Sequence, residues 1–509
     1  MEQYALEMRH IYKTFGPVVA NNDVSIKVRK GSVHALIGEN GAGKSTLMGI
    51  LSNVQKADSG EIYIDGNKVA FKDPLDAAMH GIGMVYQEFM QFGGLSVLDN
   101  ILLGFEEKKG SFINYKAARA KVEALCERYN FQLPLDEKIE SLPVATMQQV
   151  EIVKVLYRDA EIIILDEPTS VLTPQGVEGL FKAIRGLVEK GKTVIIITHK
   201  LKEVLAIADD ITVLKEGQVT GYLKAEETNE TELARLMVGR EVMLQAEKLP
   251  VVPGDVVLSV KNLSVKDSKG IQRVKNVSFD VHAGEIVGIC GVAGSGQKEL
   301  IQSIVGLMTP EQGSSIVLHG TSLQKKTIAD RRKMGMGYVP QDRNKAGTNR
   351  EGSIWETAIM GYHLVNDAIG KFIIDMKAVN HFTDDIVRNY AVKTENTNNK
   401  VRTLSGGNVQ KLLVGREFSQ NKSILIVEDP TRGIDVGAIE FIWKKIIEIA
   451  ASGVAIVLVS HELNEVMQLS DRCMVMYNGM MYEVPEESRN DERAIGVLML
   501  RGANDATEN

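Results

Sequence analysis

The chain has 509 residues, of which 44% are hydrophobic and 25% are charged, and its formal net charge at pH 7 is −7. A chain of this length is expected to form about two to four domains, and its ordinary composition excludes a largely disordered protein. The acidic balance argues against a nucleic-acid partner, because proteins that neutralise phosphates normally carry a basic face.

Membrane spans and covalent cross-links are not predicted. No apolar run approaches the roughly 18 residues that a spanning helix needs, and the beginning MEQYALEMRH lacks the basic and apolar regions of a signal peptide. We therefore expect the chain to stay in the cytosol. Cys126, Cys290 and Cys473 show neither CxxC nor His-linked spacing, so neither a disulfide framework nor a zinc site is expected.

The first strong motif is the segment 38–45, GENGAGKS, which follows the apolar strand VHALI and runs into the helical stretch TLMGILS. This order of strand, loop and helix is the context of a phosphate loop. Its glycines let backbone N–H groups approach phosphates, while Lys44 is expected to neutralise the β and γ oxygens of ATP and Ser45 to ligate Mg²⁺. The residues expected to contact nucleotide here are Gly38, Glu39, Asn40, Gly41, Ala42, Gly43, Lys44, Ser45 and Thr46.

Further along, the apolar run EIIILDEP ends in two carboxylates, Asp166 and Glu167. Paired carboxylates at a strand end suit a metal-bound nucleotide better than a buried core. Asp166 is expected to hold Mg²⁺, and Glu167 to polarise the attacking water. His199 follows the strand TVIIIT and is expected to contact the γ-phosphate, the alternative being a strand-end histidine whose ring is satisfied by backbone groups.

The chain then repeats itself with a period of about 250 residues, which is far longer than a solenoid repeat. GSVHALIGENGAGKSTL from Gly31 matches GEIVGICGVAGSGQKEL from Gly284, and ILDEPTSVLTPQG from Ile164 matches IVEDPTRGIDVGA from Ile426. We expect one domain over 1–242, a linker over 243–256 and a second domain over 257–509. β-Branched runs alternate with helical stretches, which predicts the α/β class with mainly parallel sheets.

The segment LSGGN from Leu404, followed by VQK, precedes the second acidic strand and resembles the signature motif of ATP-binding-cassette (ABC) proteins. The resemblance covers nearly the whole chain. It implies a P-loop NTPase fold with two tandem cassettes, each with a helical subdomain. It further implies that Gln87 reaches Mg²⁺ and the transmembrane partner, and that Phe15 stacks on adenine, the alternative for Phe15 being core packing.

The second copy departs from the phosphate-loop pattern. Gln297 stands where the lysine is expected, and Lys298 where a Ser or Thr would bind Mg²⁺. A neutral amide cannot replace that charge. The acidic pair reads Glu428-Asp429 in reversed order, and no aromatic stands near Val265 to stack on adenine, although His461 is retained.

The first copy has the opposite defect, because its signature position reads LPVAT over 142–146 and offers only Thr146 or Ser141 as a substitute hydroxyl. The resemblance implies that the cassettes pair head to tail within the chain, each ATP lying between one phosphate loop and the other signature. One competent site would then combine Lys44, Asp166, Glu167 and His199 with Ser405, Gly406 and Gly407. The other would hydrolyse weakly. The alternative is independent drift of the two copies.

Two cassettes without membrane spans, together with LSGGNVQK and LMVGR, resemble the ATPase subunit of bacterial importers for simple sugars and nucleosides. GVAGSGQ resembles the nucleoside branch, which is linked to basic membrane lipoproteins. The resemblance implies two permease subunits, a solute-binding lipoprotein or periplasmic protein, a peripheral place on the cytoplasmic face of the membrane, and permease contacts over 87–100 and 341–356. The alternatives are a soluble ATPase acting on ribosomes or nucleic acid, and a nonenzymatic ATP sensor.

Overall fold

The computed structural model describes residues 3–16, 18–87, 89–109, 112–169, 172, 174–240, 253–292, 294–362, 374–434 and 436–502. The chain divides into two compact units, Met1–Val242 and Met243–Asn509, and each is described by itself. Most of the predicted linker, 243–252, lies outside the described residues.

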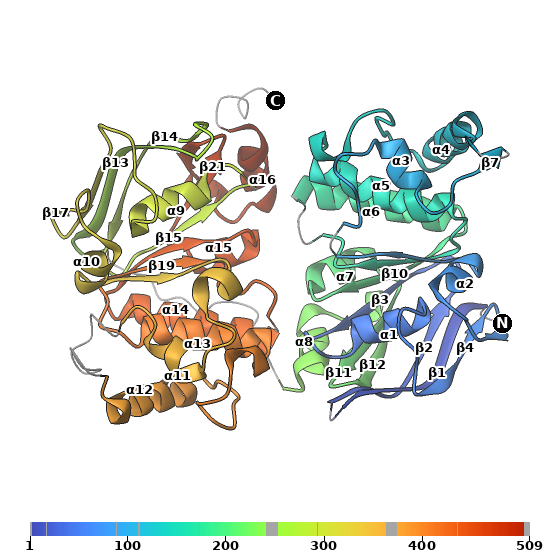
Figure 1. Ribbon diagram of the computed structural model, residues 1–509, viewed down its shortest axis with the longest axis horizontal. Helices are drawn as coiled ribbons and strands as arrows, with labels where there is room; N and C mark the ends of the chain where they lie inside the picture. The colour runs from blue at the N-terminus through green and yellow to red at the C-terminus, as the bar shows by residue number, and fades with distance from the viewer. Residues whose placement is uncertain are drawn as a thin grey trace. The chain divides into compact units, whose positions relative to one another are not determined.

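The first unit contains two main sheets (Figure 1). The smaller is antiparallel, in the order β2-β1-β4-β5. The larger has the order β12-β11-β3-β10-β9-β6, in which only β12 runs antiparallel to its neighbour. Their bounds are β1 Tyr4–Phe15, β2 Val18–Arg29, β3 Val33–Gly38, β4 Ser59–Ile64, β5 Asn67–Val69, β6 Ile82–Val85, β9 Ile162–Asp166, β10 Thr193–Thr198, β11 Asp210–Lys215 and β12 Gln218–Lys224.

The helices of the first unit include three, α3, α4 and α5, that pack on one another as the helical subdomain. A short hairpin, β7 Lys108–Lys109 and β8 Phe112–Ile113, precedes α4. The helices are α1 Lys44–Leu51, α2 Pro74–Met79, α3 Val97–Leu102, α4 Tyr115–Tyr129, α5 Val144–Tyr157, α6 Pro174–Glu189, α7 Leu201–Ile207 and α8 Glu230–Val238, with 3-10 turns Ile139–Ser141 and Ala225–Glu227.

The second unit repeats this plan, with sheets β14-β13-β16-β17 and β18-β19-β20-β15-β21-β22. Its strands are β13 Val256–Lys266, β14 Gln272–His282, β15 Ile286–Cys290, β16 Ser315–Leu318, β17 Thr321–Ser322, β18 Met336–Val339, β19 Ile424–Glu428, β20 Ala455–Val459, β21 Arg472–Tyr477 and β22 Met480–Glu483. Its helices are α9 Gln297–Val305, α10 Ile328–Lys333, α11 Ile354–Ile359, α12 Met376–Asn389, α13 Gly406–Phe418, α14 Val436–Ala451, α15 Leu463–Leu469 and α16 Glu492–Arg501, with a π-turn over Arg343–Gly347 and 3-10 turns over Val401–Thr403 and Glu486–Ser488.

The parallel register of the larger sheets decides where the functional loops meet. In the first unit Ile37 of β3 lies opposite Thr198 of β10, and Ile197 lies opposite Asp166 of β9. The three strands therefore end at one edge, and the loops that follow them leave from the same place. The strands are buried on both faces, as their continuous apolar runs predict. The expected α/β class is confirmed.

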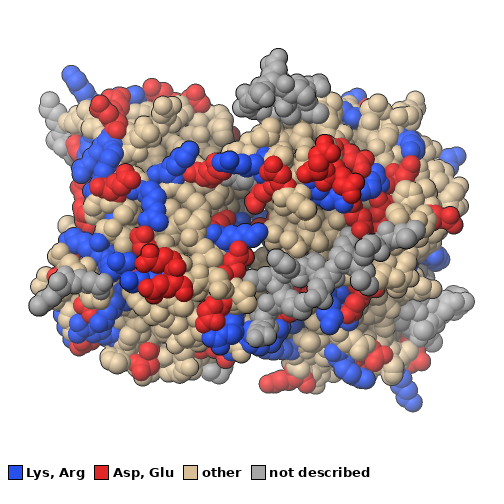
Figure 2. Space-filling model, turned by 180° about the vertical axis from the view of Figure 1, so that it is seen from behind, with Lys and Arg blue, Asp and Glu red and all other residues tan. Residues whose placement is uncertain are grey.

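The described residues include no helix that combines the length and the apolar character needed to cross a bilayer. On the face drawn in Figure 2, basic and acidic side chains alternate in small groups.

The core of the first unit contains a histidine that should make its stability depend on pH. His34 of β3 is fully buried, its Nε2 lies 2.9 Å from Thr212 Oγ1, and burial lowers its pKa from 6.5 to about 4. Between these values the unfolded chain binds a proton that the folded chain does not, so stability should fall as pH falls. The expected slope is about 1.4 kcal/mol per pH unit.

Chemical denaturation of the first unit between pH 7 and pH 4 measures this slope. His34→Gln should flatten it, because the amide does not titrate in that range. An unchanged slope in His34→Gln would assign the acid sensitivity to other groups.

Candidate nucleotide sites

The phosphate loop of the first unit connects β3 to α1 with a backbone that only glycine fits at one point. Gly43 has φ 97°, and a Cβ placed on it would lie 2.2 Å from the carbonyl oxygen of Ala20. α1 begins at Lys44, with no side-chain cap and no acidic residue in its first turn. The helix dipole therefore presents a positive end to this loop, as anion binding requires.

The side chain of Lys44 turns back from the start of α1 into this loop. Its Nζ donates to the carbonyl oxygens of Gly38 at 2.7 Å and of Glu39 at 2.9 Å. Burial lowers the pKa of Lys44, and the carboxylates of Glu167 and Asp166 oppose that shift. A buried ammonium beside carbonyl groups is completed chemically by an anionic ligand, which a nucleotide phosphate provides.

The two carboxylates at the end of β9 have different surroundings. Burial, followed by the charge of Glu167, raises the pKa of Asp166 to about 6, and the nearby Ser45 and Lys44 oppose this shift. Glu167 has φ 48°, and its backbone N–H donates to Ile197 O at 2.9 Å. This left-handed turn at a non-glycine residue is strained and aims Glu167 away from the strand direction.

Glu167 is buried and only half satisfied. Its Oε1 lies 2.8 Å from His199 Nδ1, whereas its Oε2 has no hydrogen-bond partner in the described part of the chain. An orphaned buried carboxylate oxygen normally has a water, ion or ligand as its partner. The sequence left open the alternative that backbone groups satisfy the His199 ring. The structure shows that this ring bonds to the Glu167 carboxylate. Together with the Ser45–Asp166 pair, these residues fit ATP with Mg²⁺.

Two further residues, Gln87 and Phe15, were predicted for the first site. Gln87 is exposed and comes two residues after β6, which pairs with β9 through Val85 and Leu165. Phe15 ends β1 with 47% of its surface exposed, and Lys13 Nζ lies 5.2 Å from its ring centroid. Phe15 therefore does not pack in the core, and its face can take another planar group.

In the second unit the equivalent carboxylates are occupied by protein donors. Tyr338 donates to Glu428 Oε2 at 2.6 Å, and Gln341 Nε2 donates to Asp429 Oδ2 at 2.8 Å. The backbone N–H and the ring Nδ1 of His461 each lie 2.9 Å from an oxygen of Asp429. Burial raises the pKa of Glu428, while His461 and Gln341 hold that of Asp429 below its usual range.

These residues do not fit Mg²⁺. Gln297 donates weakly to Val292 O at 3.4 Å, and Tyr338 already donates to Glu428, the carboxylate that stands at the position of Asp166. The left-handed turn is nevertheless kept, since Asp429 has φ 42° where Glu167 has φ 48°. Sequence reasoning missed Tyr338, because a tyrosine inside a short strand reads as ordinary core and Met84 stands at the same place in the first copy.

The two signature positions differ in how their helices begin. Ser405 is the N-cap of α13, and its Oγ accepts from the backbone N–H of Asn408 at 3.4 Å and from Asn408 Nδ2 at 2.9 Å. α5 begins after Pro143 with no side-chain cap. Ser141, one of the two possible substitutes, donates its hydroxyl to Lys138 O. Only the second unit therefore has a polar cap at this position.

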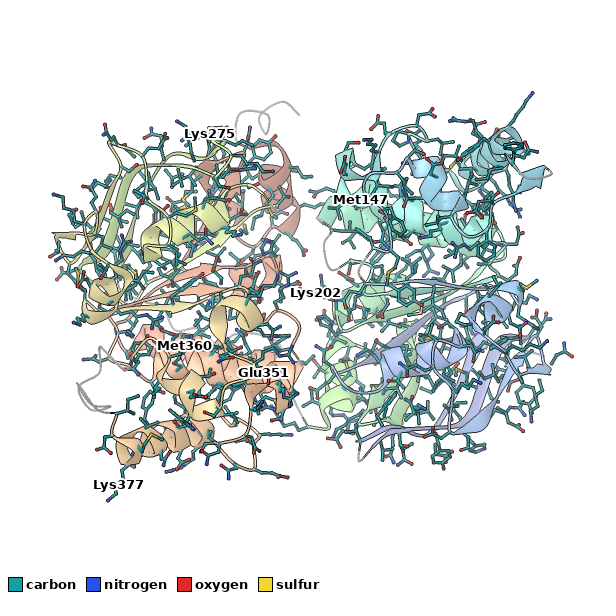
Figure 3. All side chains as sticks on the ribbon, in the orientation of Figure 1. Met147, Lys202, Lys275, Glu351, Met360 and Lys377 are labelled. Carbon is teal, nitrogen blue, oxygen red and sulfur yellow. The ribbon has the colours of Figure 1, made fainter. Side chains whose placement is uncertain are left out.

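The two predicted docking segments also differ. In 87–100, Met90, Phe92 and Leu95 are exposed by 57%, 59% and 39%. Gln91 Nε2 holds the segment to the carbonyl of Met147 at 2.8 Å, and Met147 is labelled in Figure 3. Within 341–356 no large hydrophobic side chain reaches such exposure, and Glu351, also labelled there, pairs with Lys400 at 2.9 Å.

Comparison with known proteins supports the resemblance. The family model described as ABC transporter matches residues 21–170 and 274–432. The nucleoside import ATP-binding protein NupA of Lactococcus lactis is 40% identical over 98% of this chain and 98% of its own length. The guanosine import ATP-binding protein NupO of Bacillus subtilis is 41% identical over 98% and 97%, and the ribose import ATP-binding protein RbsA of Bacillus licheniformis is 37% identical over 97% and 99%.

Among solved structures, an archaeal ribosome recycling factor in complex with a ribosomal stalk protein gives a TM-score of 0.62 at 18% identity, over 94% of this chain and 89% of that one. At this identity the likeness concerns the fold alone.

Proposed function

Since this chain belongs to the ABC transporter family, we propose that it is the ATP-hydrolysing subunit of a bacterial importer for nucleosides or simple sugars. The import proteins named above are similar to it over nearly their full length, including those named for nucleosides and guanosine. The observation that carries the proposal is the half-satisfied Glu167, held by His199 beside a complete phosphate loop.

The residues of the first unit divide the work of hydrolysis. Lys44 neutralises the β and γ phosphates, Glu167 accepts a hydrogen bond from the attacking water through its Oε2, and His199 keeps that carboxylate oriented through its Oε1. Ser45, Asp166 and Gln87 would hold Mg²⁺, which supplies charge neutralisation for the phosphates when bound. Phe15 would stack on the adenine ring.

The signature loop of the second unit, Ser405 to Gly407, acts in this proposal on the ATP that the first unit holds. This proposal is supported by the way in which the two units differ. The unit with the complete phosphate loop lacks a polar signature cap, and the unit with the capped signature has its carboxylates occupied by Tyr338 and His461. The second phosphate loop would therefore contribute little to turnover.

The permease partners would contact the first unit over 87–100. Exposed Met90 and Phe92 favour this, because clustered apolar side chains on a surface mark interaction sites. The polar segment 341–356 would make a second and different contact. A solute-binding lipoprotein would deliver the cargo, and the chain would lie at the cytoplasmic face of the membrane.

Co-purification tests this function. The chain is tagged in its native cell, membranes are extracted gently, and associated proteins are identified by mass spectrometry. Two polytopic permeases and a solute-binding lipoprotein are expected, and the lipoprotein is then titrated with nucleosides and monosaccharides. Stoichiometric ribosomal proteins without permeases would instead support the soluble ATPase alternative.

A further inference from the structure

One arginine of the second unit joins two loops that lie far apart in the sequence. Arg343 Nη1 donates to the carbonyl of Arg432 at 3.0 Å, and Nη2 approaches the carbonyl of Gly433 at 3.5 Å. The same guanidinium packs on the signature loop, since a Cβ placed on Gly406 would lie 2.8 Å from Nη2 and 3.2 Å from Cζ. Arg343 therefore lies between the signature and the loop that follows Asp429.

The segment that carries Arg343 is itself anchored. Asp342 accepts backbone hydrogen bonds from Asn344 at 3.0 Å and Lys345 at 2.9 Å, and Thr348 Oγ1 donates to Arg343 O at 2.9 Å. These contacts fix the π-turn that begins at Arg343. Because the turn starts two residues after Gln341, which bonds to Asp429, the arginine extends the same network to the signature.

The first copy lacks both members of this contact. Phe89 stands where Arg343 stands, two residues after the corresponding glutamine, and Val144 stands where Gly406 stands. A side chain at position 406 would require the guanidinium of Arg343 to shift, because a Cβ there would lie 2.8 Å from its Nη2. The two copies therefore differ at both positions of this contact.

We infer that Arg343 is a positioning residue that holds the signature loop at Ser405 and Gly406 against the backbone of Arg432 and Gly433. This inference rests on the proposed function, in which that loop acts on ATP bound to the first unit. The planar fork of arginine can donate to two carbonyls while its face covers a glycine, and lysine cannot do both. Loss of the fork would leave the phosphate loop intact and the signature misplaced.

The expected result is a lower turnover with unchanged nucleotide binding. In the full-length chain, Arg343→Ala should reduce kcat for ATP hydrolysis by about tenfold, since misplacement by about 1 Å costs up to a hundredfold. The Kd of ATP for the first unit, measured under non-hydrolysing conditions, should change by less than about twofold. Arg343→Lys should recover only part of kcat. Arg388→Ala, at an exposed arginine of α12, is the matched control.

Three measurements separate the outcomes. The Tm of Arg343→Ala should stay within about 2 °C of the wild type, because its contacts are partly exposed. A kcat equal to that of Arg388→Ala, or a fall in kcat that occurs only with a lower Tm, would overturn the inference. Glu167→Gln is measured alongside. If it also leaves kcat unchanged, the proposed function fails rather than the role of Arg343.

Discussion

Glu167→Gln is expected to lower kcat for ATP hydrolysis by at least about a hundredfold, within the range for loss of a general base. The glutamine keeps the size of the side chain and a hydrogen-bond acceptor for His199. It removes the negative charge at Oε2, the oxygen that has no protein partner among the described residues. Steady-state phosphate release by the full-length chain, with ATP binding measured separately, checks this expectation.

Asp429→Asn is the matched variant in the second unit and should change kcat by less than about tenfold. The Asp429 carboxylate already accepts hydrogen bonds from Gln341 and His461, and the neighbouring Glu428 accepts one from Tyr338. Asp429 is therefore not positioned to activate a water. The variant should affect stability more than turnover, because it leaves a buried donor without its charged acceptor. Equal losses of kcat from the two variants would contradict a single active site.

Much of the first site was predictable because its residues directly follow the ends of buried strands. A loop between a buried strand and a helix, and carboxylates that end another buried strand, must meet at the carboxyl edge of a parallel sheet. Periodicity and the glycine pattern therefore suffice to bring Lys44, Asp166 and Glu167 together. The observed register, with Ile37 opposite Thr198 and Ile197 opposite Asp166, produces that meeting.

The second site was only partly predictable. The substitutions at Gln297 and Lys298 are visible in the sequence, but the donors that replace the metal are not. Tyr338 lies on the edge strand β18, and its hydroxyl reaches Glu428 only because β18 pairs with β19. The contact of Arg343 with Gly406 is likewise set by tertiary packing over a separation of many residues, and no local pattern encodes it.

The left-handed backbone at Glu167 and Asp429 was also invisible in the sequence. Neither residue type favours φ above zero strongly enough to signal it. The turn persists in the unit that has lost its phosphate-loop lysine, and in both units the N–H of the turn residue bonds to the neighbouring strand, at Ile197 O and Val459 O. The geometry is therefore held by the sheet rather than by a bound nucleotide.

Ser405→Ala should lower kcat by about a hundredfold, whereas Thr146→Ala should lower it by less than about threefold. In the proposed arrangement the Ser405 hydroxyl and the N-terminus of α13 meet the γ-phosphate, and preorganised donors at such positions contribute about this much to turnover. The same hydroxyl caps α13 by accepting from Asn408, so alanine also loosens the first turn, at a cost of about 1 kcal/mol.

Stability and catalysis can be separated in this pair. Ser405→Thr keeps a capping hydroxyl and should restore Tm, with kcat recovering as far as the added methyl group allows. Thr146 occupies the first turn of α5, which starts after Pro143 and has no side-chain cap to lose. If Thr146→Ala proves the more damaging change, the degraded signature of the first unit is the one that serves catalysis. The assignment of Lys44 and Ser405 to one site is then wrong, because the signature that matters would lie in the same unit as the complete phosphate loop.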